Sequence, residues 1–363
     1  LTNKLIKLKY DITILDNLNS QIHGKNPEKD SYLFNSIKNK VKFIKGCVTN
    51  KKVLLKALKY QDLIIHLAAE TGTGQSMYEI EKYNNINVGG TALLLDILCN
   101  HKHQVKKIIV ASSRAIYGEG KYWSKTYNKF VYPPNRTIND LINKDFEVKF
   151  GNKKNILKLV ATDEKSIIHP NSVYGITKQV QEQLIMTVCP TLNIQPVALR
   201  YQNVYGPGQS LHNPYTGILS IFSNLILNNK DINIFEDGLE SRDFIYIEDV
   251  VNATIECIKN SKANGEIFNI GFGKPITVLT VAKTLMKLYN KNVPMKISGN
   301  FRVGDIRHNY ADISKLKKIL LFKPQTDFKT GIKHFVEWVS NQHLINNNFD
   351  KSLKELSSKG LLK

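Results

Sequence analysis

The sequence predicts a doubly wound α/β fold, with a mostly parallel sheet between two layers of helices. Three observations predict it. Short apolar segments alternate with amphipathic helical segments from residue 11 to residue 200. Two of these segments, 62–69 and 107–111, are almost continuously apolar, as strands buried on both faces of a parallel sheet must be. Polar residues follow several of the strands at their carboxyl ends, where such sheets bind ligands.

The first 200 residues hold the strands and helices of the predicted sheet, with one interruption. Residues 119–169 interrupt the alternation with only weak periodicity, and we expect them to form an excursion that covers the site. Asp16, Ser112 and Ser113 fall at the carboxyl ends of predicted strands. We expect strands at 11–16, 41–44, 62–69, 107–111 and 195–200, and helices at 1–8, 51–58, 91–98 and from Ser172 onward.

Glycine and proline residues at 205–208 mark a change in character, and a second unit is expected beyond them. The predicted domains are a large doubly wound domain of residues 1–205, to which about 243–272 returns, and a smaller α/β domain of residues 206–242 and 273–340. The tail, residues 341–363, is rich in Asn, Ser and Lys and is expected to be loosely held. In the second unit we expect helices at 215–227, 278–289 and 331–339, strands at 232–235 and 265–271, and a strand followed by a helix within 244–258.

Composition narrows the class of protein. The 363 residues are 42% hydrophobic and 23% charged, which is typical of a globular protein with a sizeable core. No apolar run is long enough to span a membrane. The net charge of +20 comes from lysines spread along the whole chain without a basic stripe, so we expect no nucleic-acid binding. The four cysteines are far apart, match no metal site, and indicate reduced thiols in a cytoplasmic protein.

A tyrosine and a lysine four residues apart carry the candidate chemistry. On a helix, Tyr174 and Lys178 share one face. A neighbouring ammonium group favours the phenolate and lowers the pKa of a tyrosine from its usual value of about 10. The same spacing recurs at Tyr78 and Tyr117, about as often as chance predicts in so lysine-rich a chain. Context favours Tyr174, which opens a helical run between two predicted strands, and we take it as the candidate proton acceptor.

Taken together, the motifs resemble the extended short-chain dehydrogenase/reductase superfamily of nucleotide-sugar epimerases and dehydratases. The resemblance extends to about residue 340 and implies that the large domain is a Rossmann-like NAD-binding domain and the smaller one binds a nucleotide sugar. It rests on residues 14–18 (Ile-Leu-Asp-Asn-Leu), 66–69 (His-Leu-Ala-Ala), 87–91 (Asn-Val-Gly-Gly-Thr), 112–118 (Ser-Ser-Arg-Ala-Ile-Tyr-Gly), 174–178, 199–207 (Leu-Arg-Tyr-Gln-Asn-Val-Tyr-Gly-Pro), 242–244 (Arg-Asp-Phe) and 302–305 (Arg-Val-Gly-Asp).

The resemblance implies a set of NAD contacts. Asp16 would accept hydrogen bonds from the adenosine ribose and repel a 2′-phosphate, which favours NAD over NADP. Other interpretations stay open: a turn acid at the end of a strand, an ordinary buried strand at 67–69, and helix capping by Asn87. The implied contacts are Asp16, Asn17, Leu67, Ala68, Ala69, Asn87, Tyr174, Lys178 and Tyr201.

The resemblance also implies the catalytic residues Ser113, Tyr174 and Lys178. Ser113 would hydrogen-bond the sugar O4 and share its proton with Tyr174, while Lys178 would also hold the nicotinamide ribose. Dehydratases of this superfamily carry an Asp-Glu pair where this chain has Arg114 and Ala115, so we do not expect dehydration.

Nucleotide-sugar binding is implied for Asn203, Arg242, Arg302 and Asp305. Arginine suits the bidentate recognition of phosphate, and the chain has only six arginines among its 51 basic residues. The alternative interpretation is that these arginines are solvated surface charges.

Within the superfamily, residues 209–217 and 304–308 look like the dTDP-L-rhamnose 4-epimerase branch, with UDP-glucose 4-epimerase as the alternative. A non-catalytic relative that binds NAD or a nucleotide sugar is the alternative outside enzymes. The resemblance further implies a homodimer, paired through helices at about 91–102 and 173–188.

One feature departs from the superfamily pattern. Its members open with a strand and a Gly-x-x-Gly-x-x-Gly turn that holds the pyrophosphate of the cofactor, and these 363 residues contain no such turn. We expect either an N-terminally truncated sequence, which we favour, or a chain that does not bind a dinucleotide in the usual way. A missing central strand leaves its neighbours unpaired, so this chain is expected to fold poorly or to be inactive.

Overall fold

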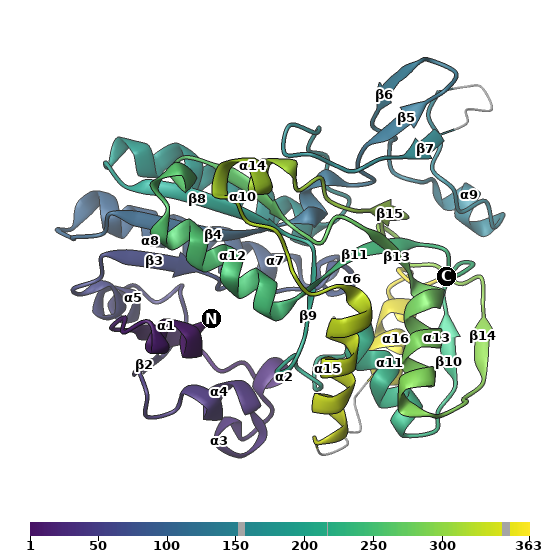
Figure 1. Ribbon diagram of the computed structural model, residues 1–363, viewed down its shortest axis with the longest axis horizontal. Coiled ribbons are helices and arrows are strands. Elements are labelled where there is room, and N and C mark those ends of the chain that lie inside the picture. The colour runs from purple at the N-terminus through teal and green to yellow at the C-terminus, as the bar shows by residue number, and fades with distance from the viewer. Residues whose placement is uncertain (152–156, 216, 343–348) are drawn as a thin grey trace.

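The computed structural model describes residues 1–151, 157–215, 217–342 and 349–363, which form two lobes (Figure 1). The large lobe is built on a parallel sheet with the strand order β12-β8-β4-β3. A second parallel pair, β1-β2, lies beside it. These strands are β1 (Thr13–Asp16), β2 (Lys42–Lys45), β3 (Leu63–His66), β4 (Lys107–Ser113), β8 (Gln195–Tyr201) and β12 (Ile267–Ile270).

The predicted doubly wound sheet is confirmed, and it is divided between β1 and β3. Within the described residues, β1 pairs with β2 and β3 pairs with β4, which leaves one edge of each strand without a partner strand. Residues 12–16 and 62–66 both line a cleft of about 1440 Å³. The cleft therefore separates the strands that a central first strand would join, as the missing turn predicts.

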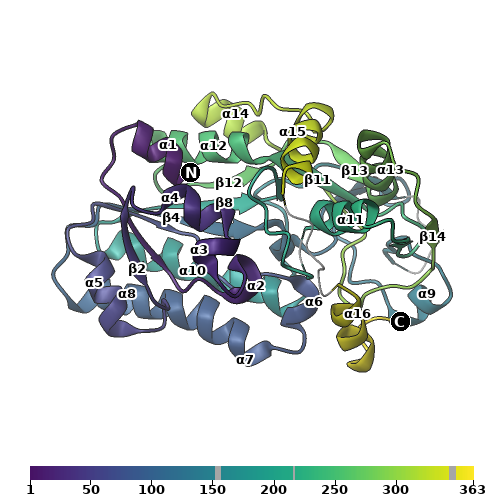
Figure 2. The same ribbon diagram turned by 90° about the horizontal axis from the view of Figure 1, so that it is seen from below.

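Helices cover both faces of the large sheet, and Figure 2 shows the sheet between these two layers. Side chains alternate along β4: Ile108 and Val110 pack on one layer, whereas Ile109 packs on the other. The first layer contains α5 (Lys51–Leu58), α8 (Gly90–Asn100) and α10 (Val173–Thr191), and the second contains α1 (Thr2–Lys7), α12 (Ile247–Lys259) and α14 (Ser314–Leu320).

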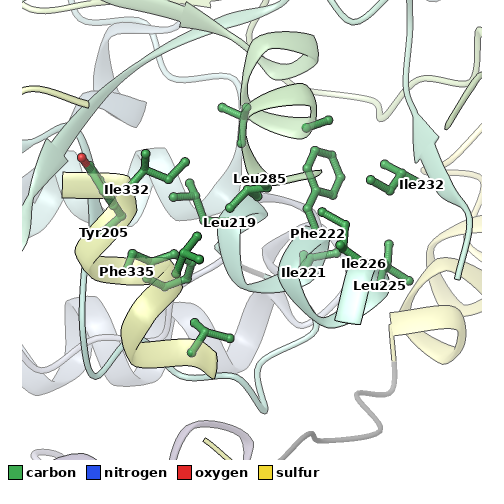
Figure 3. Packing of buried hydrophobic residues seen from close by; sticks show 14 of the residues in the cluster. Tyr205, Leu219, Ile221, Phe222, Leu225, Ile226, Ile232, Leu285, Ile332 and Phe335 are labelled. Atoms are coloured by element: carbon green, nitrogen blue, oxygen red, sulfur yellow. The ribbon is translucent and has the colours of Figure 1, made fainter. Parts of the chain in front are cut away.

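The small lobe has its own core, in which α11 (Ile218–Leu227), α13 (Val278–Tyr289) and α15 (Phe328–Ser340) pack together (Figure 3). Phe222, Leu285 and Phe335 come from these three helices. The strands of this lobe are β9 (Asn203–Tyr205), β11 (Ser241–Tyr246), β13 (Pro275–Thr277) and β15 (His308–Asn309) in one sheet, and β10 (Ile232–Ile234) with β14 (Met295–Ile297) in another.

The expected excursion is a three-stranded sheet with one helix, but it does not cover the cleft. None of the described residues in 119–169 lines the cleft. The excursion instead packs on the small lobe, where Arg136 donates to Glu236 at 2.8 Å and Arg307 donates to Glu147 at 2.9 Å. Its elements are β5 (Tyr122–Ser124), β6 (Lys129–Val131), β7 (Leu157–Leu159) and α9 (Ile138–Ile142).

The tail also differs from the prediction of a loosely held segment. Residues Phe349–Ser358 form the helix α16, because Phe349, Ser352 and Leu356 make one buried face. The exposed positions of this helix include Asp350, Lys351 and Lys354, and this polar composition hides the buried stripe in the sequence. Residues 343–348 of the tail lie outside the described residues.

Short helices complete the chain, and no helix in the described ranges is both long and apolar enough to cross a membrane. They are α2 (Ser20–His23), α3 (Pro27–Asp30), α4 (Tyr32–Ile37), α6 (Thr73–Ser76), α7 (Ile80–Tyr83), a π-helical turn (Asn84–Gly89) and two 3₁₀ turns (Arg114–Tyr117 and Ser261–Ala263).

Candidate active site

The cleft runs from the carboxyl ends of β1, β3 and β4 to the small lobe, and it gathers almost every predicted site residue. Segments far apart in the sequence meet there because parallel strands end at the same edge of a sheet. The predicted residues that line the cleft are Asp16, Asn17, Leu67, Ala68, Ala69, Ser113, Tyr174, Lys178, Tyr201, Asn203, Arg242, Arg302 and Asp305.

Tyr174 lies in the first turn of α10, and its side chain is hydrogen-bonded to that of Ser113 at the end of β4. Two hydroxyls hold the start of this helix. Ser172 caps it by accepting from the N–H of Gly175 at 3.1 Å, and Ser76 accepts from the N–H of Tyr174 at 3.0 Å. The phenol and the serine hydroxyl therefore meet on a backbone that is fixed from two sides.

The electrostatics at Tyr174 differ from the expectation that Lys178 lowers its pKa. Burial raises the pKa of Tyr174, while the hydrogen bond from Ser113 and the charge of Arg114 act to lower it. Lys178 instead donates from Nζ to Oε1 of Gln181 at 2.8 Å. Burial lowers the pKa of Lys178 to about 7, against the opposing charge of Glu182.

Behind Lys178 lies a buried hydrogen-bond network. The Thr91 hydroxyl donates to the carbonyl oxygen of Asn87 at 2.7 Å, so it acts as an acceptor for its other neighbours. These are Gln181 Nε2 and His66 Nε2, each at 2.8 Å. Nε2 of His66 also lies 3.3 Å from Nε2 of Gln181. Burial, together with the charge of Lys178, lowers the pKa of His66 to about 4.

Asn87 was assigned to the cofactor by resemblance, and it does not line the cleft. Its side chain is fully buried and clamps the segment after β3. Oδ1 accepts from the N–H of Glu70 at 2.7 Å, and Nδ2 donates to the carbonyl oxygen of Glu70 and to Thr177 Oγ1 at 3.1 and 2.9 Å. Asn87 therefore joins this segment to α10 and positions the cleft wall.

Two basic residues define the small-lobe end of the cleft. Arg242 is only 7% exposed, and it donates to the carbonyl oxygens of Ser241 and Arg307 and to Asp305 Oδ1 at 3.0 Å. The guanidinium of Arg302 lies 4.8 Å from the ring centre of Phe235, and its Nε has no hydrogen-bond partner within the described residues. Arg242 is buried and Arg302 is partly buried against Phe235, which contradicts the interpretation of both as solvated surface charges.

Asp305 is held as a carboxylate at this end. Burial acts to raise the pKa of Asp305, but the charges of Arg242 and Arg302 outweigh it and lower that pKa. Asn203 lies nearby on β9, with a buried Oδ1 that has no hydrogen-bond partner within the described residues.

Several cleft residues were missed by sequence reasoning. Arg114 lies close enough to lower the pKa of Tyr174, and burial lowers the pKa of Arg114 itself to about 9. Arginine is rare in this chain, with six among the 51 basic residues, and this rarity could have marked Arg114 as a candidate site residue. Asn233, Phe235 and Glu240 also line the cleft, and no pattern marked them. Burial and the charges of nearby acids raise the pKa of Glu240 to about 7, although the charge of Arg242 acts to lower it.

Comparison with known proteins agrees with this geometry. The sequence matches the NAD-dependent epimerase/dehydratase family over residues 1–137 and 150–271, which is more than half of the chain. The chain belongs to this family. A dTDP-L-rhamnose 4-epimerase of Burkholderia thailandensis is 35% identical to it, over 91% of this chain and 88% of that protein.

Two further relatives cover nearly the whole length. A putative UDP-glucose 4-epimerase of Methanocaldococcus jannaschii is 30% identical, over 94% of this chain and 95% of that protein. The crystal structure of UDP-glucose 4-epimerase from Thermotoga maritima with UDP-glucose superposes with a TM-score of 0.72 at 26% identity, covering 93% of this chain and 94% of that one.

The residues present fit the two ends of the family's NAD. Asp16 lies at the end of β1, its Oδ1 fixed by the N–H of Leu18 at 2.7 Å, where it can accept from an adenosine ribose. Small side chains at Ala68 and Ala69 leave room beside it. Tyr174 and Lys178 stand at the other end. No glycine-rich turn lies between, because these 363 residues contain none.

Proposed function

We propose that this chain is an NAD-dependent nucleotide-sugar 4-epimerase that acts by transient oxidation at C4 of the sugar. The observation that carries the proposal is the hydrogen-bonded pair of Ser113 and Tyr174 in the wall of a cleft whose far end holds Arg242 and Arg302. The pair is suited to moving a proton on a sugar hydroxyl. The arginines Arg242 and Arg302 are suited to a diphosphate.

The chain's residues would act as follows. Ser113 orients the sugar O4, and Tyr174 removes its proton. NAD, held by residues such as Asp16 and Lys178, would supply a reversible hydride acceptor for sugar C4, so no external oxidant would be consumed. After the keto sugar has turned over, Tyr174 returns the proton to O4 of the opposite epimer. Lys178, with a pKa lowered to about 7, would hold the nicotinamide ribose, and Arg114 would favour the phenolate of Tyr174 by its charge.

Arg114 and Ala115 also support epimerisation over dehydration. Elimination of water needs an acid and a base beside the sugar, and neither of these two side chains can supply a carboxyl group. The most similar of the relatives reported above, at 35% identity, favours dTDP-L-rhamnose as the substrate. UDP-glucose is the second candidate, supported by the Methanocaldococcus and Thermotoga relatives.

A nucleotide-sugar-binding relative without catalysis is a candidate from another class. A homodimer paired through α8 and α10 is also proposed, since Ile176 on α10 is 47% exposed.

The test uses the chain with a glycine-rich first strand fused ahead of Leu1. dTDP-L-rhamnose and UDP-glucose are each incubated with it and NAD, and the C4 epimers are quantified by NMR. Tyr174→Phe is expected to reduce turnover at least about a hundredfold, because general acid–base catalysis typically contributes that much. Tyr60→Phe is the control, since Tyr60 also lines the cleft but is 83% exposed and has no assigned role in the site. Undiminished turnover in Tyr174→Phe would refute the assigned role.

A further inference from the structure

The end of the chain contacts both lobes. In α16, Leu356 lies against α6 of the large lobe, where a Cβ atom added to Gly74 would be 3.2 Å from Leu356 Cδ2. On the same buried face, Ser352 Oγ lies 3.4 Å from the carbonyl oxygen of Pro214, in the loop that precedes α11 of the small lobe. Figure 2 shows α16 beside α6, at the boundary between the lobes.

Glu355 links the two lobes through two tyrosines. Its Oε2 accepts a hydrogen bond from the hydroxyl of Tyr215, which lines the cleft in the small lobe. The same oxygen accepts from Tyr78 of the large lobe at 3.3 Å. Burial, reinforced by Glu355, raises the pKa of the Tyr215 hydroxyl, so this group stays a donor at neutral pH.

Beyond α16, the last residues pair with the segment that carries Arg302. Leu362 forms an antiparallel bridge with Arg302. The N–H of Phe301 donates to the carbonyl oxygen of Lys363 at 2.8 Å, and the N–H of Val303 donates to that of Leu361 at 2.9 Å. Hydrogen bonds therefore hold the backbone on both sides of Arg302.

The part of the large lobe that α16 contacts is itself in contact with Tyr174. α6, against which Leu356 packs, contains Ser76, whose hydroxyl accepts from the N–H of Tyr174. Residues 349–363 thus touch both α6, which contacts the backbone of Tyr174, and the segment that carries Arg302. The distance between these two groups decides whether a nucleotide sugar can reach both at once.

We propose that residues 349–363 form a clasp that holds the two lobes together and positions Arg302 for the nucleotide diphosphate, with Glu355 and Leu362 as positioning residues. The proposal rests on the proposed function, because its ligand is the diphosphate part of that substrate.

Binding of UDP and of dTDP to the 363-residue chain tests the clasp by isothermal titration calorimetry. Glu355→Gln weakens two hydrogen bonds to a carboxylate, and we expect about tenfold weaker binding. Deletion of residues 360–363 removes the pairing at Arg302 and should have a similar effect. Asp350→Asn is the matched control, because its carboxylate lies on the same helix, is exposed and faces only Lys230 at 3.9 Å among the described residues.

If Glu355 and residues 360–363 had a purely structural role, their variants would have a lower melting temperature but unchanged dissociation constants at 15 °C. Equal dissociation constants in all four proteins would overturn the clasp. Failure of the unaltered chain to bind either nucleotide would instead refute the proposed function.

Hydrogen–deuterium exchange tests the clasp without a ligand. Deletion of 360–363 should speed exchange at the amides of Phe301 and Val303 at least tenfold. Glu355→Gln should speed exchange in residues 72–78 and 209–215, whereas Asp350→Asn should not. Unchanged exchange in both variants would overturn the proposal whatever the nucleotide result.

Discussion

His66 offers a direct test of the buried network behind Lys178. It is 6% exposed and its Nε2 is hydrogen-bonded to the hydroxyl of Thr91 at 2.8 Å. Burial, with the charge of Lys178, lowers its pKa from 6.5 to about 4. Between these two values the unfolded chain binds a proton that the folded chain does not. Stability contributed by neutral His66 is therefore present above pH 6.5 and lost as the pH falls towards 4.

The size of this loss follows from the two pKa values. At pH 7.5 the imidazole is neutral in both the folded and the unfolded chain, so it hardly changes the free energy of unfolding. At pH 4.5 the cost to the folded state is about 2.5 kcal/mol, and it approaches about 3.4 kcal/mol below pH 4. His66→Gln keeps a donor towards Thr91 but has no group that titrates in this range.

The assay is urea denaturation of both proteins at pH 7.5 and pH 4.5. The stability advantage of the unaltered chain over His66→Gln should shrink by about 2.5 kcal/mol between the two. His101→Gln is the control, because His101 is exposed at the end of α8 and is not part of the buried network. If the difference for His66→Gln stays constant within about 0.5 kcal/mol, His66 is not a buried neutral histidine.

Three further predictions concern the cleft and its support. Arg302→Lys keeps the charge but loses the planar fork and the stacking on Phe235, so UDP should bind at least about tenfold more weakly by calorimetry; unchanged binding would exclude a phosphate contact. Glu182→Gln removes the carboxylate that is paired with buried Arg200 at 2.6 Å. The free energy of unfolding, measured by urea denaturation, should fall by about 3–5 kcal/mol. A fall of less than about 1 kcal/mol would show that Arg200 has another partner. Fusion of an apolar strand and a glycine-rich turn ahead of Leu1 should raise the melting temperature and produce NAD binding, measured by fluorescence titration. Fusion of the turn alone should do neither. Tight NAD binding by the 363-residue chain would contradict the need for that strand.

The sheet and most of the cleft could be predicted because they depend on local patterns. Continuous apolar segments such as 107–111 identify buried parallel strands, and parallel strands bring their carboxyl ends to one edge. Ser113 and Tyr174 therefore meet as the motif spacing suggests.

The contacts of individual polar side chains could not be predicted, because they depend on which neighbours fold against them. Lys178 turns to Gln181, and the pKa of Tyr174 responds to burial more than to any cation. Asn87 has the right place in the motif, but its amide is used by Glu70 and Thr177.

The tail shows a second limit of sequence reasoning. Its polar composition predicts a loose segment, yet three residues, Phe349, Ser352 and Leu356, are enough to bury one face of α16. Such a stripe is too short to recognise without the surface on which it packs.

The location of the hydrogen at sugar C4 tests the central claim most directly. The chain with the fused glycine-rich strand is incubated with NAD and dTDP-L-rhamnose or UDP-glucose in D₂O, and the product is read by NMR. Return of the same hydride predicts an inverted C4 that carries no deuterium. Deuterium at C4, or inversion that proceeds equally well in Tyr174→Phe, would contradict oxidation at C4 by a tyrosine-assisted hydride transfer.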